Sequence, residues 1–287
     1  MMDAARAEHA ADTPVPALPP SPELARRLAS SPLLVALDID GTLAPIASTP
    51  AGAAVPEATL QTLRHLTGLR GVQVAFVTGR SAADGRRMVE LPHTRVIGNH
   101  GIEWIEPDGA LRVNGAARAA APRIAKAADM LSQRLREING ALVENKQWTL
   151  SVHFRLTALS DRPVIEQALD DAARRLDLRV THGKQVYELR PKLDITKGTA
   201  LVELAERLGI GQGTGSLFYA GDDRTDEDAF RSLRDLGIGA VTVHVGGDAP
   251  TGVATAAEFV VPNPQALREL LAWLVAERGG ATPEPSP

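Results

Sequence analysis

The sequence predicts an α/β protein, in which a Rossmann-like parallel sheet carries a smaller inserted α+β module. The chain has 287 residues, 44% of them hydrophobic, which is enough to bury a large core. Four short apolar runs are each followed by a turn and a helical pattern, as in parallel sheets. The middle of the chain instead alternates apolar and polar residues, which is typical of a sheet with one open face.

The four apolar runs predict the strands of the parallel sheet. They span residues 33–37, 72–77, 216–220 and 240–245. Runs this short and this apolar are typical of strands that are buried on both faces. The second run leads into "TGRSAADGRRMVEL", a strand-to-helix junction, and the third leads into "GDDRTDEDAFRSLRDLG", which opens like a helix and stops at Gly237.

Two further segments predict helices that pack on this sheet. In "KGTALVELAERLG" the apolar residues at positions 201, 204, 205 and 208 share one helical face, and Gly209 ends the segment. Near the end of the chain, leucines follow the spacing i, i+3, i+4, i+7 at Leu267, Leu270, Leu271 and Leu274. We therefore expect a last amphipathic helix that closes the core.

The inserted module is predicted between residues 109 and 190. The segments "PRIAKAADMLSQRLREI" and "PVIEQALDDAARRL" are amphipathic helix candidates. In "WTLSVHFR" one face carries Trp148, Leu150, Val152 and Phe154, and the other carries Thr149, Ser151, His153 and Arg155. This pattern indicates a small sheet with helices on one side and a polar face left open.

These patterns predict the domain boundaries. The core is expected at residues 31–108 and 191–277, and the module at residues 109–190. Residues 1–30 and 278–287, which are rich in Ala, Pro and Gly, are expected to be disordered ends.

Composition excludes several classes of function. The net charge of −4 gives no global electrostatic reason to bind nucleic acid or an anionic membrane. The chain has no cysteine, so disulfides, thiolate catalysis and zinc–thiolate sites are excluded. Because we find neither a secretory signal nor an apolar run that could span a bilayer, we expect a cytoplasmic protein. The sequence does not determine the oligomeric state, and a monomer is the default expectation.

Two aspartates follow the first predicted strand directly, in the stretch "LLVALDIDGTLAP". If the strand geometry persists, Asp38 and Asp40 project to the same side. In parallel α/β sheets ligands bind outside the carboxyl ends of the strands, where both acids fall. Two carboxylates this close repel each other, and a divalent cation or a shared proton would relieve the repulsion. Gly41 and Thr42 follow in a tight turn, which leaves backbone N–H groups available to an anion.

The ends of the other segments add groups that suit a phosphate. Thr78, Gly79 and Arg80 follow the second strand and offer a hydroxyl and a backbone amide at the start of a helix. Lys197 precedes Gly198 at the start of another helix, which places an ammonium group at the edge of the crevice.

The third strand ends in further carboxylates, Asp222 and Asp223, with Asp226 three residues on. Carboxylates without a neighbouring His or Cys suit a hard, oxygen-loving ion, so Mg²⁺ is the expected cofactor. A nucleophile, an acid/base, a phosphate cradle, a cation and a metal together predict a phosphoryl-transfer site.

The ordered set "DIDGT", "TGR", "K" and "GDD" resembles the haloacid dehalogenase superfamily of phosphatases, over residues 31–277. The resemblance implies that Asp38 attacks phosphorus and becomes an aspartyl phosphate. Asp40 would protonate the leaving alcohol and then deprotonate the water that hydrolyses the intermediate. Thr78 and Lys197 would hold the phosphoryl group.

The same resemblance implies the metal ligands. Mg²⁺ would lie between Asp38, the backbone carbonyl of Asp40 and Asp222, with Asp223 nearby. It also implies that the inserted module is a cap that covers the crevice.

The polar face of this cap predicts the substrate class. It offers Glu144, Lys146, Ser151, His153, Arg155, Lys184, Glu188 and Arg190. Carboxylates interleaved with cations can donate and accept many hydrogen bonds at once, which suits polyhydroxylated ligands such as sugars.

Four segments resemble trehalose-6-phosphate phosphatases more narrowly. They are "GNHGIEW", "VENKQWTLSVHFR", "GKQVYELRP" and "GDDRTDEDAF". This resemblance implies that the sugar is contacted by Glu144, Lys146, Arg155 and Glu188. It implies that the entrance between core and cap is lined by Asn99, His100 and Gly101. It also implies a functional link to trehalose-6-phosphate synthase, which would supply the substrate, as the last step of trehalose biosynthesis.

Other functions remain open at this point. A phosphatase of the same fold could act on sucrose phosphate, a mannosyl phosphoglycerate or a simple hexose phosphate, because only the cap separates these substrates. A phospho-accepting regulatory module would also combine acids, Thr and Lys on a parallel sheet. The inserted sheet and the second carboxylate at Asp40 argue against that module, since a poised acid/base shortens the life of an acyl phosphate.

Overall fold

The computed structural model describes residues 20–183, 185–211, 213–235, 237, 239–246 and 255–280. Most of the predicted disordered ends, residues 1–19 and 281–287, and the polar-face residue Lys184 lie outside these ranges. The prediction of disorder is wrong for Pro22–Arg27, which form helix α1, and for Arg278 and Gly279, which end helix α8 (Pro264–Gly279). Ser21 caps helix α1, and Leu24 and Leu28 are buried against the main core.

The main sheet has eight strands in the order β12-β11-β10-β1-β2-β3-β4-β5 among the described residues. They are β1 (Leu33–Leu37), β2 (Val72–Val77), β3 (Arg95–Gly98), β4 (Glu103–Ile105), β5 (Leu111–Val113), β10 (Ser216–Gly221), β11 (Val241–Val245) and β12 (Phe259–Val261). The strands from β12 to β3 pair in parallel, and β4 and β5 pair antiparallel at one edge. The four predicted strands are confirmed as β1, β2, β10 and β11, which lie side by side at the centre.

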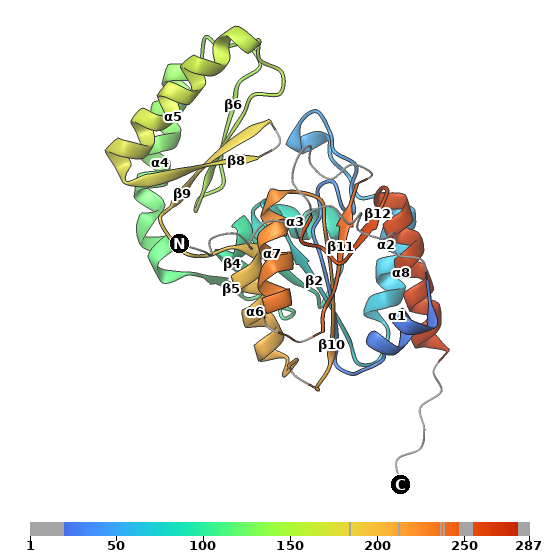
Figure 1. Cartoon of the computed structure of the whole chain (residues 1–287). Coiled ribbons are helices and arrows are strands. Elements are labelled where there is room, and N and C mark those ends of the chain that lie inside the picture. The colour runs from blue at the N-terminus through green and yellow to red at the C-terminus, as the bar shows by residue number, and fades with distance from the viewer. Residues whose placement is uncertain are drawn as a thin grey trace, which may run out of the picture.

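Helices cover both faces of this sheet (Figure 1). They are α2 (Glu57–Thr67), α3 (Ala82–Val89), α6 (Lys197–Arg207), α7 (Arg224–Asp235) and α8 (Pro264–Gly279). The four leucines of α8 pack on one face together with buried residues of α1 and α2, which confirms the predicted closing helix. Helices α6 and α7 pack on the other face against Leu34, Ala36 and Tyr219.

A second sheet of four antiparallel strands forms the inserted module, the cap, in the order β6-β7-β9-β8. The strands are β6 (Leu142–Asn145), β7 (Leu150–His153), β8 (Leu178–Gly183) and β9 (Val186–Pro191), and the helices are α4 (Gly115–Leu135) and α5 (Arg162–Leu176). Both helices pack on one face of the sheet in a separate hydrophobic cluster. In Figure 1 the cap lies above and to one side of the main sheet.

Two details differ from the sequence predictions. Strand β5 pairs with β4 and extends the main sheet, so Leu111–Val113 lie in the core and not in the cap as the boundary at residue 109 predicted. Trp148 does not join the apolar face of β7, because that strand begins at Leu150. Its ring instead packs with Ile102 and Ala117.

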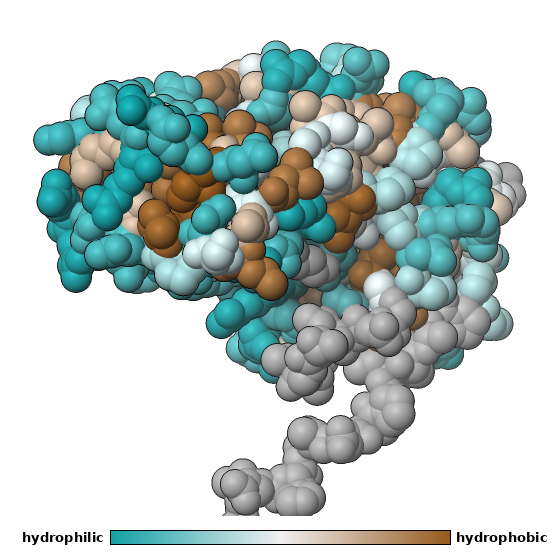
Figure 2. Space-filling view, turned by 90° about the horizontal axis from the view of Figure 1, so that it is seen from above, coloured by the Kyte–Doolittle hydropathy of each residue, from teal (hydrophilic) through white to brown (hydrophobic). Residues whose placement is uncertain are grey.

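The surface carries both hydrophobic and hydrophilic residues (Figure 2). Seen from above, hydrophobic residues lie among hydrophilic ones in separate groups (Figure 2). The exposed large apolar side chains include Ile46, Leu142, Leu156 and Leu159, and scattered exposure of this kind is normal. Within the described ranges, no helix combines the length and the apolar character that a membrane span needs.

Candidate active site

Asp38 lies at the centre of the candidate site, immediately after β1. Its backbone N–H donates to the carbonyl of Ala220, and its side chain is only 5% exposed. Lys197, the first residue of α6, donates to Asp38 Oδ1 at 2.7 Å and to Asp226 Oδ1 at 2.8 Å. The structure therefore brings together a carboxylate and an ammonium group that are 159 positions apart in the chain.

Burial and the neighbouring charges shift the pKa values of both Asp38 and Lys197. Burial raises the pKa of Asp38 well above its usual range, and the neighbouring carboxylates of Asp226 and Asp222 add to the effect, while Lys197 opposes it. Burial alone would lower the pKa of Lys197, but Asp226 and Asp38 outweigh it and raise that pKa well above its usual range. The ammonium group therefore stays charged, and it compensates part of the negative charge around it.

The carboxylates of Asp38, Asp222 and Asp226 converge, with one oxygen of each within 4.8 Å of the others. Gly41 permits this approach, because a Cβ at that position would lie 2.1 Å from Asp222 Oδ2, and its φ of +83° also favours glycine. Oxygen donors without sulfur or nitrogen fit Mg²⁺. A divalent cation would also relieve the charge repulsion that helps to raise the pKa of Asp38.

Asp226 organises this cluster, a role that the sequence did not assign to it. One oxygen accepts from Lys197 and the hydroxyl of Tyr219, and the other accepts from the backbone N–H groups of Asp222 and Asp223, both at 3.0 Å. Four donors occupy the acceptor sites of this carboxylate. Asp226 therefore holds the loop after β10 in place, and the oxygens left for a cation belong to Asp38 and Asp222. In the sequence, the only indication of this role was that Asp226 follows Asp222 by four residues.

Asp223 has a local role in the structure. It lies outside the converging group, and its Oδ1 accepts from the backbone N–H and the hydroxyl of Thr225, both at 2.7 Å. Burial would raise the pKa of Asp223, but Lys197 and the hydrogen bonds from Thr225 lower it. As direct ligands of one cation, Asp38 and Asp222 are therefore better placed than Asp223.

Asp40 lines the same cleft, and its side chain pairs with Arg80. The guanidinium group makes two hydrogen bonds to this carboxylate, at 2.6 and 2.7 Å, and a third to the carbonyl of Pro50. A bidentate pair of this kind fixes both side chains. The predicted neighbours Asp38 and Asp40 thus face one cleft with different partners.

Thr42 and Thr78 are buried beside the cleft and are not among the described residues that line it. The hydroxyl of Thr78 accepts from the backbone N–H of Arg80 at 3.1 Å. The hydroxyl of Thr42 has no hydrogen-bond partner among the described residues. A buried hydroxyl without a partner is costly, so a ligand with acceptor atoms would stabilise it.

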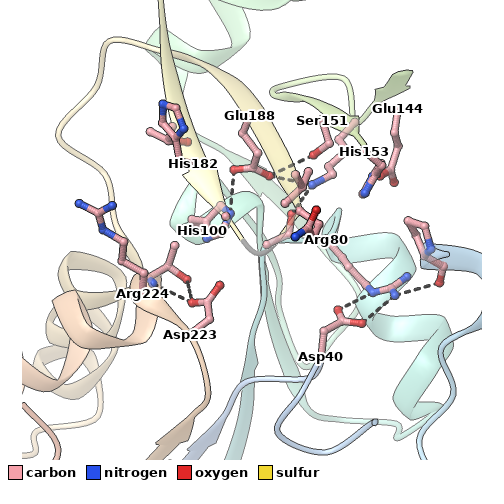
Figure 3. A pocket seen from close by; sticks show the side chains of 18 of the residues that line it. Asp40, Arg80, His100, Glu144, Ser151, His153, His182, Glu188, Asp223 and Arg224 are labelled. Atoms are coloured by element: carbon pink, nitrogen blue, oxygen red, sulfur yellow. Dashed lines mark hydrogen bonds and ion pairs between the residues drawn. The ribbon is translucent and has the colours of Figure 1, made fainter. Parts of the chain in front are cut away.

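The cap contributes a second charged cluster across the cleft (Figure 3). Lys146 donates to Glu188 at 2.8 Å and to the backbone carbonyl of Gly79 at 2.9 Å. Glu188 is also 3.0 Å from His100 Nε2 and accepts from Ser151 at 3.2 Å. Because Gly79 and His100 belong to the core, these contacts connect the two sheets directly.

Burial and neighbouring charges shift the pKa values of Glu188 and His100 in opposite directions. Burial would raise the pKa of Glu188, but Lys146, His100 and Arg190 lower it well below its usual range. Burial lowers the pKa of His100, in spite of Glu188. The carboxylate is thus ionised, and it can accept hydrogen bonds from a polar ligand in the cleft.

The cleft between these clusters has a volume of about 570 Å³. It is lined from the core by Asp38, Asp40, Lys197 and Asp222, and from the cap by Glu144, Lys146, Arg155 and Glu188. Glu144 pairs with His153 at 2.8 Å. A cleft of this size can hold a small polar molecule that reaches from one cluster to the other.

Of the three residues predicted at the entrance, only His100 lines this cleft. Asn99 is fully buried, because both ends of its amide are hydrogen-bonded inside the protein. Gly101 lies at a smaller pocket beside β5 and α6. The prediction that Asn99 and Gly101 line the entrance between core and cap is therefore wrong.

Solved structures of known proteins resemble this chain over most of its length. The C-terminal domain of a trehalose-6-phosphate phosphatase from Candida albicans superimposes with a TM-score of 0.75 at 24% identity, over 91% of this chain and 98% of that one. At this identity the likeness concerns the fold. It confirms the predicted haloacid dehalogenase-like fold with an α/β core.

Proteins related to this chain in sequence are more similar to it, with identities of 36% and 37%. A trehalose-phosphate phosphatase from Mycobacterium avium is 37% identical over 249 residues, which are 85% of this chain and 63% of the relative. An uncharacterized glycosyl hydrolase from Mycobacterium tuberculosis is 36% identical over 225 residues, 77% of this chain and 17% of its own length. The chain thus spans less than two thirds of these curated relatives.

The family model described as trehalose-phosphatase matches residues 36–260. This range includes both carboxylates after β1, the start of α6, the loop after β10 and the whole cap sheet. The chain therefore belongs to the trehalose-phosphatase family.

Proposed function

We propose that this protein hydrolyses trehalose 6-phosphate to trehalose and phosphate, with Mg²⁺ as cofactor and through an aspartyl-phosphate intermediate. The observation that supports this most strongly is that one cleft holds both charged clusters. Asp38 and Lys197 lie on its core side, and Lys146 and Glu188 lie on its cap side. The first pair suits a phosphoryl group, and the second suits sugar hydroxyls.

The chemistry follows from the carboxylates of the core. A side-chain oxygen of Asp38 attacks phosphorus, and the bond from phosphorus to the sugar oxygen breaks. Asp40 gives a proton to that oxygen, so trehalose leaves as a neutral alcohol. Asp40 then takes a proton from water as the water attacks the acyl phosphate, which releases phosphate and restores Asp38.

Asp40 can act as an acid only when Arg80 releases it, because the resting pair is bidentate. The guanidinium group also suits a phosphate. We propose that the substrate phosphoryl group draws Arg80 away from Asp40, with Thr78, Gly79, Thr42 and Lys197 as the other groups around it. Mg²⁺ would be held by Asp38, Asp222 and the backbone carbonyl of Asp40, where it would neutralise charge on the phosphoryl oxygens.

Substrate choice is assigned to the cap. Glu144, Lys146, Arg155 and Glu188 would contact the sugar, with His100 beside them. Sucrose phosphate, a mannosyl phosphoglycerate and hexose phosphates remain the alternatives, since they require the same core. The position at the end of trehalose biosynthesis, the supply by a synthase, the cytoplasmic location and the monomeric state stay predictions.

Removal of divalent cations is expected to abolish phosphate release, and Mg²⁺ should restore it. The measurement is a phosphate-release assay over trehalose 6-phosphate and the alternative sugar phosphates, after complete chelation and after addition of Mg²⁺. Turnover that survives chelation would contradict the metal assignment. A faster reaction with another sugar phosphate would replace the proposed substrate. A long-lived phosphoprotein without turnover would favour the regulatory module.

Glu188→Ala is expected to lower kcat/KM for trehalose 6-phosphate by about 100-fold and for 4-nitrophenyl phosphate by less than about 3-fold. The reason is that Glu188 is buried on the cap side of the cleft, and its described partners Lys146, His100 and Ser151 are not among the groups proposed to hold the phosphoryl group. Glu137→Ala, at an exposed position of the cap, is the matched control. Equal losses on both substrates would argue against recognition of the sugar by the cap.

A further inference from the structure

Glu103, the first residue of β4, is a buried carboxylate outside the lining of the cleft described above. It is 5% exposed, and no cation pairs with it in the part of the chain that the structure describes. Three N–H groups compensate its charge. They belong to Ala82 (2.8 Å), Asn99 (2.6 Å) and Trp148 (2.9 Å).

Each of these donors lies close in sequence to a different residue that lines the cleft. Ala82 begins α3, two residues after Arg80. Asn99 precedes His100, and both residues have positive φ, 49° and 56°. Trp148 belongs to the cap and lies two residues after Lys146. One carboxylate thus connects three segments: the loop of residues 78–80 after β2, called here the phosphate loop, the turn at Asn99 and His100, and the cap.

A second hydrogen bond, from the neighbouring residue Thr149, also joins the cap to this network. The hydroxyl of Thr149 donates to the side-chain oxygen of Asn99 at 2.5 Å, while the amide of Asn99 donates to Glu103. The ring of Trp148 packs on Ile102 of the core. Two neighbouring cap residues are therefore held by one buried polar network of the core.

A carboxylate in this position favours a single arrangement of its donors. Because Glu103 is buried and has no counter-ion, loss of one N–H donor leaves part of a charge uncompensated. In the orientation of the cap seen here, all three donors reach this carboxylate. That orientation also brings Lys146 to Gly79 and Glu188 to His100.

We infer that Glu103 is a positioning residue, which acts through Trp148 and Asn99 to hold the cap in register with the phosphate loop. This inference rests on the proposed function for its kinetic consequence, but not for its structural one. It makes the distance between the sugar-binding and the phosphate-binding groups depend on a residue that touches neither. Substrates that use both clusters need this register, and small phosphates do not.

The kinetic test uses Trp148→Phe, which removes the N–H group and keeps an aromatic ring. We expect kcat/KM for trehalose 6-phosphate to fall by about 10-fold, while the value for 4-nitrophenyl phosphate stays within about 2-fold. Glu103→Gln should have a similar selective effect, and the double variant should lose no more than the larger single loss. Tyr187→Phe is the matched control, because it removes a hydroxyl bond to Glu166 within the cap alone.

The structural test does not depend on activity. Since the chain has no cysteine, spin labels can be attached at Glu137→Cys in the cap and Asp235→Cys in the core, both at exposed positions. We expect one narrow distance distribution in the otherwise unchanged protein and in Tyr187→Phe, and a broader one in Trp148→Phe.

The outcomes separate the two proposals. If the unchanged protein does not hydrolyse the sugar phosphate, the proposed function fails, and the distance distributions alone decide the role of Glu103. If it does, but Trp148→Phe changes neither the selectivity nor the distances, the positioning role is refuted. Parallel losses on both substrates in Trp148→Phe would also refute it, because they would show a general structural role.

Discussion

Asp38→Asn is expected to lower kcat by about 10³-fold or more, since the amide cannot attack phosphorus at a useful rate. The fold should persist. The carboxylate is buried and its charge is disfavoured by Asp226 and Asp222, so a neutral side chain of the same shape leaves the stability equal or higher. Lys197 keeps its bond to Asp226 in this variant.

Steady-state kinetics and thermal unfolding of both proteins check this expectation. Rapid quenching with labelled substrate should give a hydroxylamine-sensitive phosphoprotein in the unchanged protein and none in Asp38→Asn. Asp129→Asn, at an exposed position of α4, is the control. Undiminished phosphatase activity in Asp38→Asn would remove Asp38 as the nucleophile.

Lys197→Met is expected to lower the free energy of unfolding by about 3–5 kcal/mol and to abolish activity. The reason is that the Lys197 side chain is 2% exposed and its ammonium group pairs with both Asp38 and Asp226. Its removal leaves buried carboxylates without that compensation. Saturating Mg²⁺ should recover part of the lost stability, because a divalent cation supplies positive charge to the same carboxylates.

Urea denaturation with and without Mg²⁺ measures this effect. Lys192→Met is the matched control, because Lys192 pairs with Asp177 at the same distance of 2.7 Å but at the surface. We expect little change in the control, since exposed ion pairs contribute little to stability. A loss in Lys197→Met no larger than in the control would contradict the view that this charge compensates the buried site.

Much of the core could be predicted because its signals are local. An apolar run followed by a polar strand end identifies β1, β2 and β10, and the order of the motifs along the chain identifies Asp38, Lys197 and Asp222 as candidates. The edge of the sheet was different. Strands β3, β4, β5 and β12 are only three or four residues long, too short for a periodic signal, and β5 was assigned to the wrong side of the boundary.

The partners of the site residues could not be predicted. Nothing in the sequence indicates that Asp40 pairs with Arg80, or that Asp226 accepts from four donors. Asn99 shows the same limit, since its neighbour His100 lines the cleft while Asn99 itself is buried. Such contacts depend on how distant segments pack, and a one-residue step around a turn reverses which side chain faces the ligand.

The fold class, the inserted cap and the residue types of a phosphoryl-transfer site could be predicted from short stretches of sequence, because strand burial, helix periodicity and strand-end polarity are local properties. The convergence of the carboxylates, the saturation of Asp226 by four donors and the contacts between cap and core depend on how the whole chain folds. They depend on it because charge compensation in a buried site is set by distances. Those distances join residues that lie far apart along the chain.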